Sequence, residues 1–84
     1  MPHVVVKLYA GRSEQQKARI AELVAQAIID GAGSSEGSVS VAIEDVQPDQ
    51  WTAEVYEPDI QGRQDKLYKM PGYGPLAGVP LPSR

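Results

Sequence analysis

The 84-residue sequence contains no cysteine and a single histidine, His3. Without cysteine, disulfide bridges and thiolate metal sites are excluded, and one histidine leaves no histidine cluster for zinc or iron. A chain this short is marginally stable alone and usually needs a staple or a partner. We therefore expect a single domain over residues 1–84 that forms a homo-oligomer.

Positive charge is also scarce, because eight Lys and Arg residues stand against eleven Asp and Glu residues, for a net charge of −3. A nucleic-acid partner is not expected, since phosphate binding needs a basic surface. No apolar run is long enough to span a bilayer. Residues 1–7 lack the basic segment and the long apolar stretch of a signal peptide. We expect a cytoplasmic protein without a membrane partner.

The first half of the sequence has a strand–helix–strand pattern. Residues 4–9 are mostly β-branched or apolar and predict a strand. Ser13 and Gln16 have the spacing of a capping box and open an amphipathic helix, which we expect to end at Asp30 and the small residues after it. Residues 38–45 alternate with a period of two and predict a second strand. The two strands should be parallel and joined by a right-handed crossover.

This unit leaves part of its sheet uncovered. Val39, Val41 and Ile43 share the parity that should face the helix, whereas Ser40 points the other way. Two strands and one helix leave the second sheet face open, so a second copy of the chain can cover it or extend the sheet. The fold class expected is α/β, an α+β sandwich.

The second half gives weaker signals. Residues 47–50 predict a turn, and Trp51 follows it. Residues 58–69 predict a second short helix, because Pro58 suits a first-turn position. Residues 71–84 are rich in proline and glycine and cannot form a helix or a central strand. We expect an extended carboxyl-terminal tail that is either disordered or laid over a neighbouring subunit.

Conventional catalytic patterns are missing, since the sequence has neither a Gly-x-Ser-x-Gly motif nor a phosphate-binding loop. The distinctive residue is Pro2. Removal of Met1, which a small second residue permits, would leave Pro2 with a free secondary amine at the start of a strand. A free α-amino group titrates near ~8, and an apolar pocket lowers that pKa toward the range of a general base. Taken alone, Pro2 is more readily explained as an ordinary second residue without a catalytic role.

The arrangement of these residues resembles the 4-oxalocrotonate tautomerase family. The likeness covers residues 2–52 and rests on Pro2, the short strand, the amphipathic helix and the strand at residues 38–45. The block that follows the first strand is the most specific part: Gly11, Arg12, Ser13, Gln16 and Lys17. The second half resembles the dimeric phenylpyruvate tautomerase branch as far as Tyr73, through residues 38–43, Gln47, Pro48, Trp51, Lys69, Pro71 and Gly72.

The resemblance implies a cofactor-independent keto–enol tautomerase, an isomerase without a metal. Pro2 would be the catalytic general base and acid, Arg12 would bind the substrate carboxylate, and Trp51 would keep the pocket apolar. A guanidinium suits a planar carboxylate because two parallel hydrogen bonds form. Hexameric members carry a second arginine where this chain has Ser40, which donates a hydrogen bond but supplies no cation. A small monocarboxylate of the arylpyruvate type is therefore favoured as substrate, and a homodimer is favoured over a hexamer.

Other interpretations remain open for the same residues. Related proline-dependent enzymes are hydratases, dehalogenases or decarboxylases, and a chain that retains Met1 would be a non-catalytic oligomeric binding module. Arg12 could be a solvated residue, Ser40 a sheet or interface residue, and Trp51 a core residue. His3 and Lys7 share a strand face and could line a site or lie in solvent. Tyr73 could reach a neighbouring site if the tail exchanges between subunits.

Overall fold

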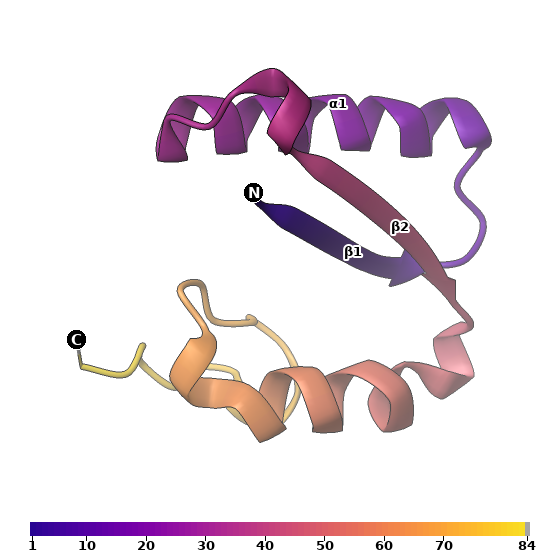
Figure 1. Ribbon diagram of the computed structural model, residues 1–84. Coiled ribbons are helices and arrows are strands. Elements are labelled where there is room, and N and C mark those ends of the chain that lie inside the picture. Colours follow the sequence, from indigo (N-terminus) through magenta and orange to yellow (C-terminus); the bar gives the residue numbers. More distant parts are fainter. Residues whose placement is uncertain (84) are drawn as a thin grey trace. The chain divides into compact units, whose positions relative to one another are not determined.

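The computed structural model describes residues 1–83, which form two compact units that divide after Pro48. Each unit is described by itself, and the expectation of one domain over residues 1–84 stays a prediction. The first unit contains strand β1 (His3–Tyr9), helix α1 (Glu14–Ala32), the 3₁₀ turn η1 (Glu36–Ser38) and strand β2 (Ser40–Val46). The two strands pair in parallel (Figure 1), which confirms the β–α–β pattern.

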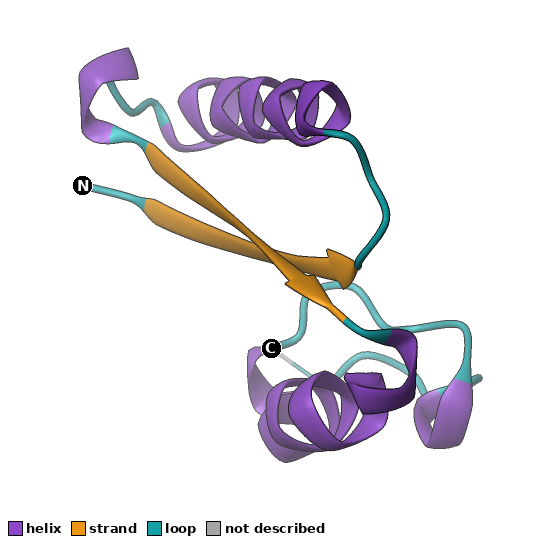
Figure 2. Cartoon of the chain, turned by 90° about the vertical axis from the view of Figure 1, so that its right-hand side faces the viewer, coloured by secondary structure: helices purple, strands orange, loops and turns teal. Residues whose placement is uncertain are grey.

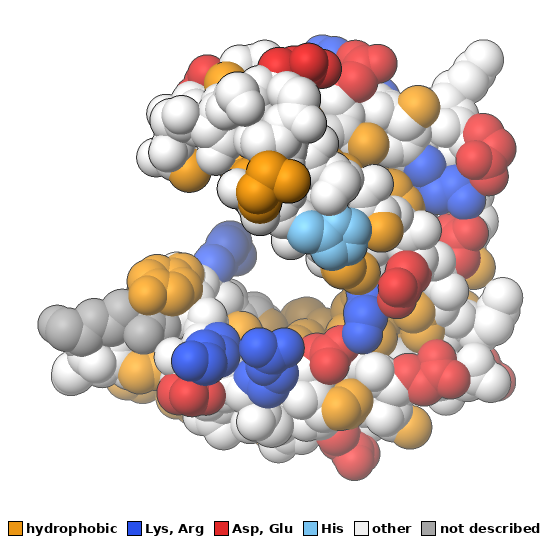
Figure 3. All heavy atoms as spheres, in the orientation of Figure 1, with side chains coloured by type: hydrophobic (Ala, Val, Ile, Leu, Met, Phe, Trp, Pro, Cys, Tyr) orange, Lys and Arg blue, Asp and Glu red, His pale blue; other side chains and the backbone are white. Residues whose placement is uncertain are grey.

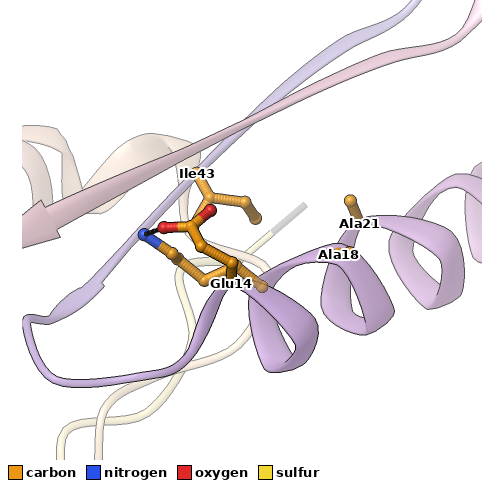
Figure 4. Close-up of a pocket in the computed structure, with 5 residues that line it drawn as sticks. Glu14, Ala18, Ala21 and Ile43 are labelled. Carbon is orange, nitrogen blue, oxygen red and sulfur yellow. Dashed lines mark ion pairs between the residues drawn. The ribbon is translucent and has the colours of Figure 1, made fainter.

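The sheet register pairs His3 with Ser40 at one end and Tyr9 with Val46 at the other. Helix α1 runs along one face of this two-stranded sheet (Figure 2). Ile43 lines a hollow together with Ala18 and Ala21 of α1 (Figure 4), so the Val41 and Ile43 face of β2 is the helix-facing one, as expected. His3 and Ser40 therefore lie on the opposite face.

Helix α1 begins at the predicted capping box. The Ser13 hydroxyl accepts a hydrogen bond from the Gln16 amide (3.1 Å), and the Gln16 side chain accepts one from the Ser13 amide (2.9 Å). The helix continues past Asp30 and ends at Gly33, whose φ of 68° is the left-handed conformation that terminates helices. The helix therefore ends among the small residues after Asp30, as expected.

Strand β2 begins two residues later than the expected Ser38. The Ser38 amide and hydroxyl both donate to the carbonyl oxygen of Ser35, at 3.1 and 2.8 Å. These bonds close the short turn η1, so Ser38 is withdrawn from the sheet.

Lys17 ties the first turn of α1 to β2. Its ammonium lies 2.9 Å from Oε1 of Glu14 and 2.9 Å from Oδ2 of Asp45, and its side chain is 16% exposed. The hydrogen bonds to Glu14 and to Asp45 raise the pKa of the Lys17 ammonium. The ion pair with Asp45 links the helix to the strand, whereas the pair with Glu14 lies within the first turn of α1.

The second unit begins with the 3₁₀ turn η2 (Pro48–Gln50), which occupies the predicted turn. The π-helix η3 (Thr52–Ile60) and the 3₁₀ helix η4 (Gln61–Lys66) follow. The expected helix start at Pro58 is wrong, because the chain is helical from Thr52 and Pro58 lies inside η3. Burial explains the difference, since Val55 and Tyr56, 5% and 3% exposed, both precede the proline. A π-type turn is wider than an α-turn, and this suits a proline that lacks an amide hydrogen.

Part of the carboxyl-terminal tail is folded onto its own unit. Residues Gly74–Leu76 form the 3₁₀ turn η5, and Leu76 is 7% exposed. The Tyr56 hydroxyl donates to the Tyr73 carbonyl (2.7 Å) and accepts from the Leu76 amide (3.0 Å). The expectation of a disordered tail is therefore wrong for residues 73–76, and the alternative of an arm laid over a neighbour stays a prediction. Within residues 1–83, no helix combines the length and apolar character of a membrane span.

Candidate active site

Pro2 lies immediately before β1 and is half-buried, whereas Met1 is fully exposed. The carbonyl oxygen of Pro2 accepts a hydrogen bond from the Ser40 amide at 3.2 Å. This bond belongs to the parallel pairing of the two strands, so the sheet itself fixes the backbone of Pro2 beside Ser40. Two of the residues singled out in the sequence are thus brought together at one end of the sheet.

His3 completes this group, although sequence reasoning did not select it as a site residue. Its ring nitrogen Nδ1 lies 2.7 Å from Oγ of Ser40, and the two side chains are hydrogen-bonded. The signal that could have identified it is the register, since His3 and Ser40 are direct partners in a parallel pair. The register depends on the offset of one strand along the other, and the alternation of residues in the sequence does not determine this offset.

Arg12 lies beyond the opposite end of β1. The strand has seven residues, and with six steps of about 3.3 Å its first and last residues are roughly 20 Å apart. The exposed Arg12 side chain donates from Nη1 to the carbonyl oxygen of Tyr9 at 3.1 Å. Figure 1 shows the amino terminus at one end of β1 and the loop that carries Arg12 at the other. One chain therefore does not bring Arg12 to Pro2.

Trp51 belongs to the second unit and is half-buried there. Its indole Nε1 donates to the hydroxyl of Tyr73 at 2.9 Å. The Tyr73 ring meets the Tyr56 ring edge-on, with centroids 5.1 Å apart and an interplanar angle of 70°. Tyr56 was missed in the sequence, where only its position next to Val55 suggested burial. Tyr73, itself packed against Tyr56, thus holds the orientation of the Trp51 ring within this unit.

The hollow along α1 does not contain the candidate residues. It is lined by Glu14, Lys17, Ala18, Ala21 and Ile43 and holds the Lys17–Glu14 ion pair (Figure 4). Acidic and basic side chains lie next to one another on the face shown in Figure 3. Among residues 1–83, no three His, Asp or Glu side chains are grouped as metal ligands would be.

The chain is similar to known tautomerases over most of its length. The family model described as "Tautomerase enzyme" matches residues 2–56, so the match begins at Pro2. A probable tautomerase of Xylella fastidiosa is 44% identical over 95% of this chain and 98% of its own. Tautomerase PptA of Pectobacterium carotovorum is 46% identical over 87% of this chain and 97% of its own.

Solved structures agree with these sequence matches. A 4-oxalocrotonate tautomerase isozyme from Methylibium petroleiphilum superimposes with a TM-score of 0.58 at 36% identity, over 60% of this chain and 81% of that one. TomN, a 4-oxalocrotonate tautomerase homologue, gives a TM-score of 0.58 at 32% identity, over 60% of this chain and 77% of its own. The chain belongs to the tautomerase family, with the parallel β–α–β fold of that family, and is an isomerase of the keto–enol tautomerase type.

Proposed function

We propose that this enzyme interconverts the enol and keto forms of a small 2-oxo monocarboxylic acid of the arylpyruvate type, without a cofactor. The single observation that carries the proposal is the hydrogen bond from the Ser40 amide to the Pro2 carbonyl oxygen at the start of the sheet. This bond holds the backbone of Pro2 next to Ser40, a residue with a neutral hydroxyl at the position where hexameric members of the resembled family have an arginine. The family match that begins at Pro2 supports the same assignment.

The proposed reaction moves one proton. The free Pro2 nitrogen accepts the proton of the enol hydroxyl, the oxygen–carbon bond becomes a carbonyl, and the carbon–carbon double bond takes the proton back from Pro2 at C3. Charge on the oxygen develops during this transfer, so a hydrogen-bond donor nearby lowers the barrier. The Ser40 hydroxyl is the proposed donor. The free amine requires removal of Met1, because an acylated nitrogen has no basic lone pair.

Arg12 is the proposed partner of the substrate carboxylate. Since Arg12 and Pro2 lie at opposite ends of β1 in one chain, the proposed site takes Pro2 from one copy and Arg12 from another. This is our reason to propose a homo-oligomer, with a dimer favoured. For Trp51 we keep the proposal that its ring supplies apolar surface to the substrate, on the strength of the family resemblance.

Substrate preference provides the test of the proposed function. The chain that begins at Pro2 should ketonise phenylenolpyruvate roughly 10–100-fold more efficiently, in kcat/KM, than the dicarboxylate 2-hydroxymuconate, because a missing charged hydrogen bond costs about 1.5–3 kcal/mol. The loss of enol absorbance measures both rates. The Ser40→Arg variant is the matched control and should shift the preference toward the dicarboxylate. Absence of ketonisation, or halide release from 3-chloroacrylate as the faster reaction, would contradict the proposal.

The Arg12→Ala variant should lose roughly 10–100-fold in kcat/KM for phenylenolpyruvate, mainly through a higher KM, because a charge-assisted carboxylate contact is lost. Arg12→Lys keeps the positive charge but cannot form two parallel hydrogen bonds to a carboxylate. Its kcat/KM should therefore lie between those of the wild type and of Arg12→Ala.

Hybrid oligomers test whether two copies share a site. A chain with a blocked Pro2 and the Arg12→Ala chain, unfolded and refolded together, should recover roughly a quarter of the wild-type rate. Half of the dimers are then hybrids, and each hybrid has one intact site of two. At a substrate concentration well below KM, each variant refolded alone should keep no more than about a tenth of the wild-type rate. No recovery on mixing would place Pro2 and Arg12 of one chain in the same site, and a wild-type rate for the Arg12→Ala chain alone would exclude Arg12 from the site.

A further inference from the structure

His3 and Ser40 form a hydrogen-bonded pair next to the proposed base. Nδ1 of His3 and Oγ of Ser40 are 2.7 Å apart, and the Ser40 amide donates to the Pro2 carbonyl at 3.2 Å. Both side chains are exposed at the end of the sheet face that α1 does not cover. His3 directly follows Pro2 in the sequence, and Ser40 is its partner in the sheet. A molecule bound next to Pro2 could therefore contact both side chains.

The direction of this hydrogen bond decides what Ser40 offers to a substrate. A serine hydroxyl has one proton and two lone pairs. If Nδ1 accepts that proton, Ser40 presents only lone pairs outward, which repel a developing negative charge. If Nδ1 carries a proton and donates it to Oγ, the hydroxyl proton is free to point at the substrate oxygen. Linked donors of this kind also polarise one another.

We propose that His3 is a positioning residue whose Nδ1–H donates to Ser40, so that the Ser40 hydroxyl donates to the 2-oxo oxygen of the substrate. This inference rests on the proposed function and deepens it, because it names how a chain without a second arginine stabilises that oxygen. The other charged residues of this sheet face, Lys7 and Glu44, are register partners four positions along, about 13 Å away. The imidazole is therefore the charged or polar ring nearest to Ser40 on this face.

The proton position can be measured without activity, because His3 is the only histidine. A ¹⁵N spectrum of the imidazole at the assay pH shows directly which ring nitrogens are protonated. We expect a proton on Nδ1, and we expect the Nδ1 resonance to shift in the Ser40→Ala variant. An unprotonated Nδ1 would overturn the inference, whatever the enzyme does with phenylenolpyruvate. Lack of ketonisation by the wild-type chain with a free Pro2 would instead overturn the proposed function.

A double-mutant cycle shows whether His3 acts through Ser40. Ser40→Ala should lower kcat about 10²-fold, as loss of one oxyanion donor does. His3→Leu should lower it roughly tenfold in the wild-type background and leave it almost unchanged in the Ser40→Ala background. His3→Asn, whose amide nitrogen can replace Nδ1 as donor, should keep most of kcat. Equal losses from His3→Leu in both backgrounds, or an Asn variant as slow as the Leu variant, would overturn the inference.

Discussion

Blocking the Pro2 nitrogen is expected to lower kcat for phenylenolpyruvate ketonisation about 10²–10⁴-fold, the range that a positioned general base contributes. The comparison uses one sequence in two forms, one beginning at Pro2 and one carrying a short amino-terminal extension. Only the first has a basic lone pair, because an extension turns the nitrogen into an amide. Met1 is fully exposed, so added residues should leave the sheet intact.

The matched controls separate chemistry from folding. Intact mass spectrometry establishes that Pro2 is free in one form and acylated in the other, and circular dichroism and light scattering should give the same fold and oligomeric state for both. When kcat/KM is measured against pH, its fall at low pH reports protonation of the base in the free enzyme. This fall should be present only in the form with the free Pro2 nitrogen. Equal kcat in the two forms would remove Pro2 from the mechanism.

The second large effect concerns stability. Tyr56→Phe is expected to lower the free energy of unfolding by about 2–3 kcal/mol, because one hydroxyl serves both the Tyr73 carbonyl and the buried Leu76 amide. Removing it leaves a buried amide unsatisfied, which costs about 1–3 kcal/mol. The ring of Tyr56 remains in the variant, so its packing against Tyr73 is retained.

A urea titration followed by tryptophan fluorescence measures this effect. Trp51 is the only tryptophan, and its hydrogen bond to Tyr73 places it in the affected cluster. Tyr68→Phe removes the same hydroxyl group from a residue that is 76% exposed, and it should change stability by no more than about 0.5 kcal/mol. If Tyr56→Phe unfolds at the same urea concentration as Tyr68→Phe, the hydroxyl does not fasten residues 73–76.

Local signals in the sequence determined the strand–helix–strand pattern of the first unit. Alternation gave the two strands, and the Ser13 and Gln16 spacing gave the helix start, because a capping box is formed within a single turn. Pro2, Arg12, Ser40 and Trp51 came from the resemblance to tautomerases, and their roles stay proposals. The family itself is established by the match over residues 2–56.

Only the tertiary structure decided the features that depend on residues far apart in the chain. The helical segment begins at Thr52 because Tyr56 is buried against Tyr73 and Leu76, so packing outweighs the local preference of Pro58 for a first turn. The strand register, set between residues 37 positions apart, brings His3 to Ser40. The length of β1 keeps Arg12 away from Pro2 in one chain. Burial and register are properties of the folded chain, and no local pattern encodes them.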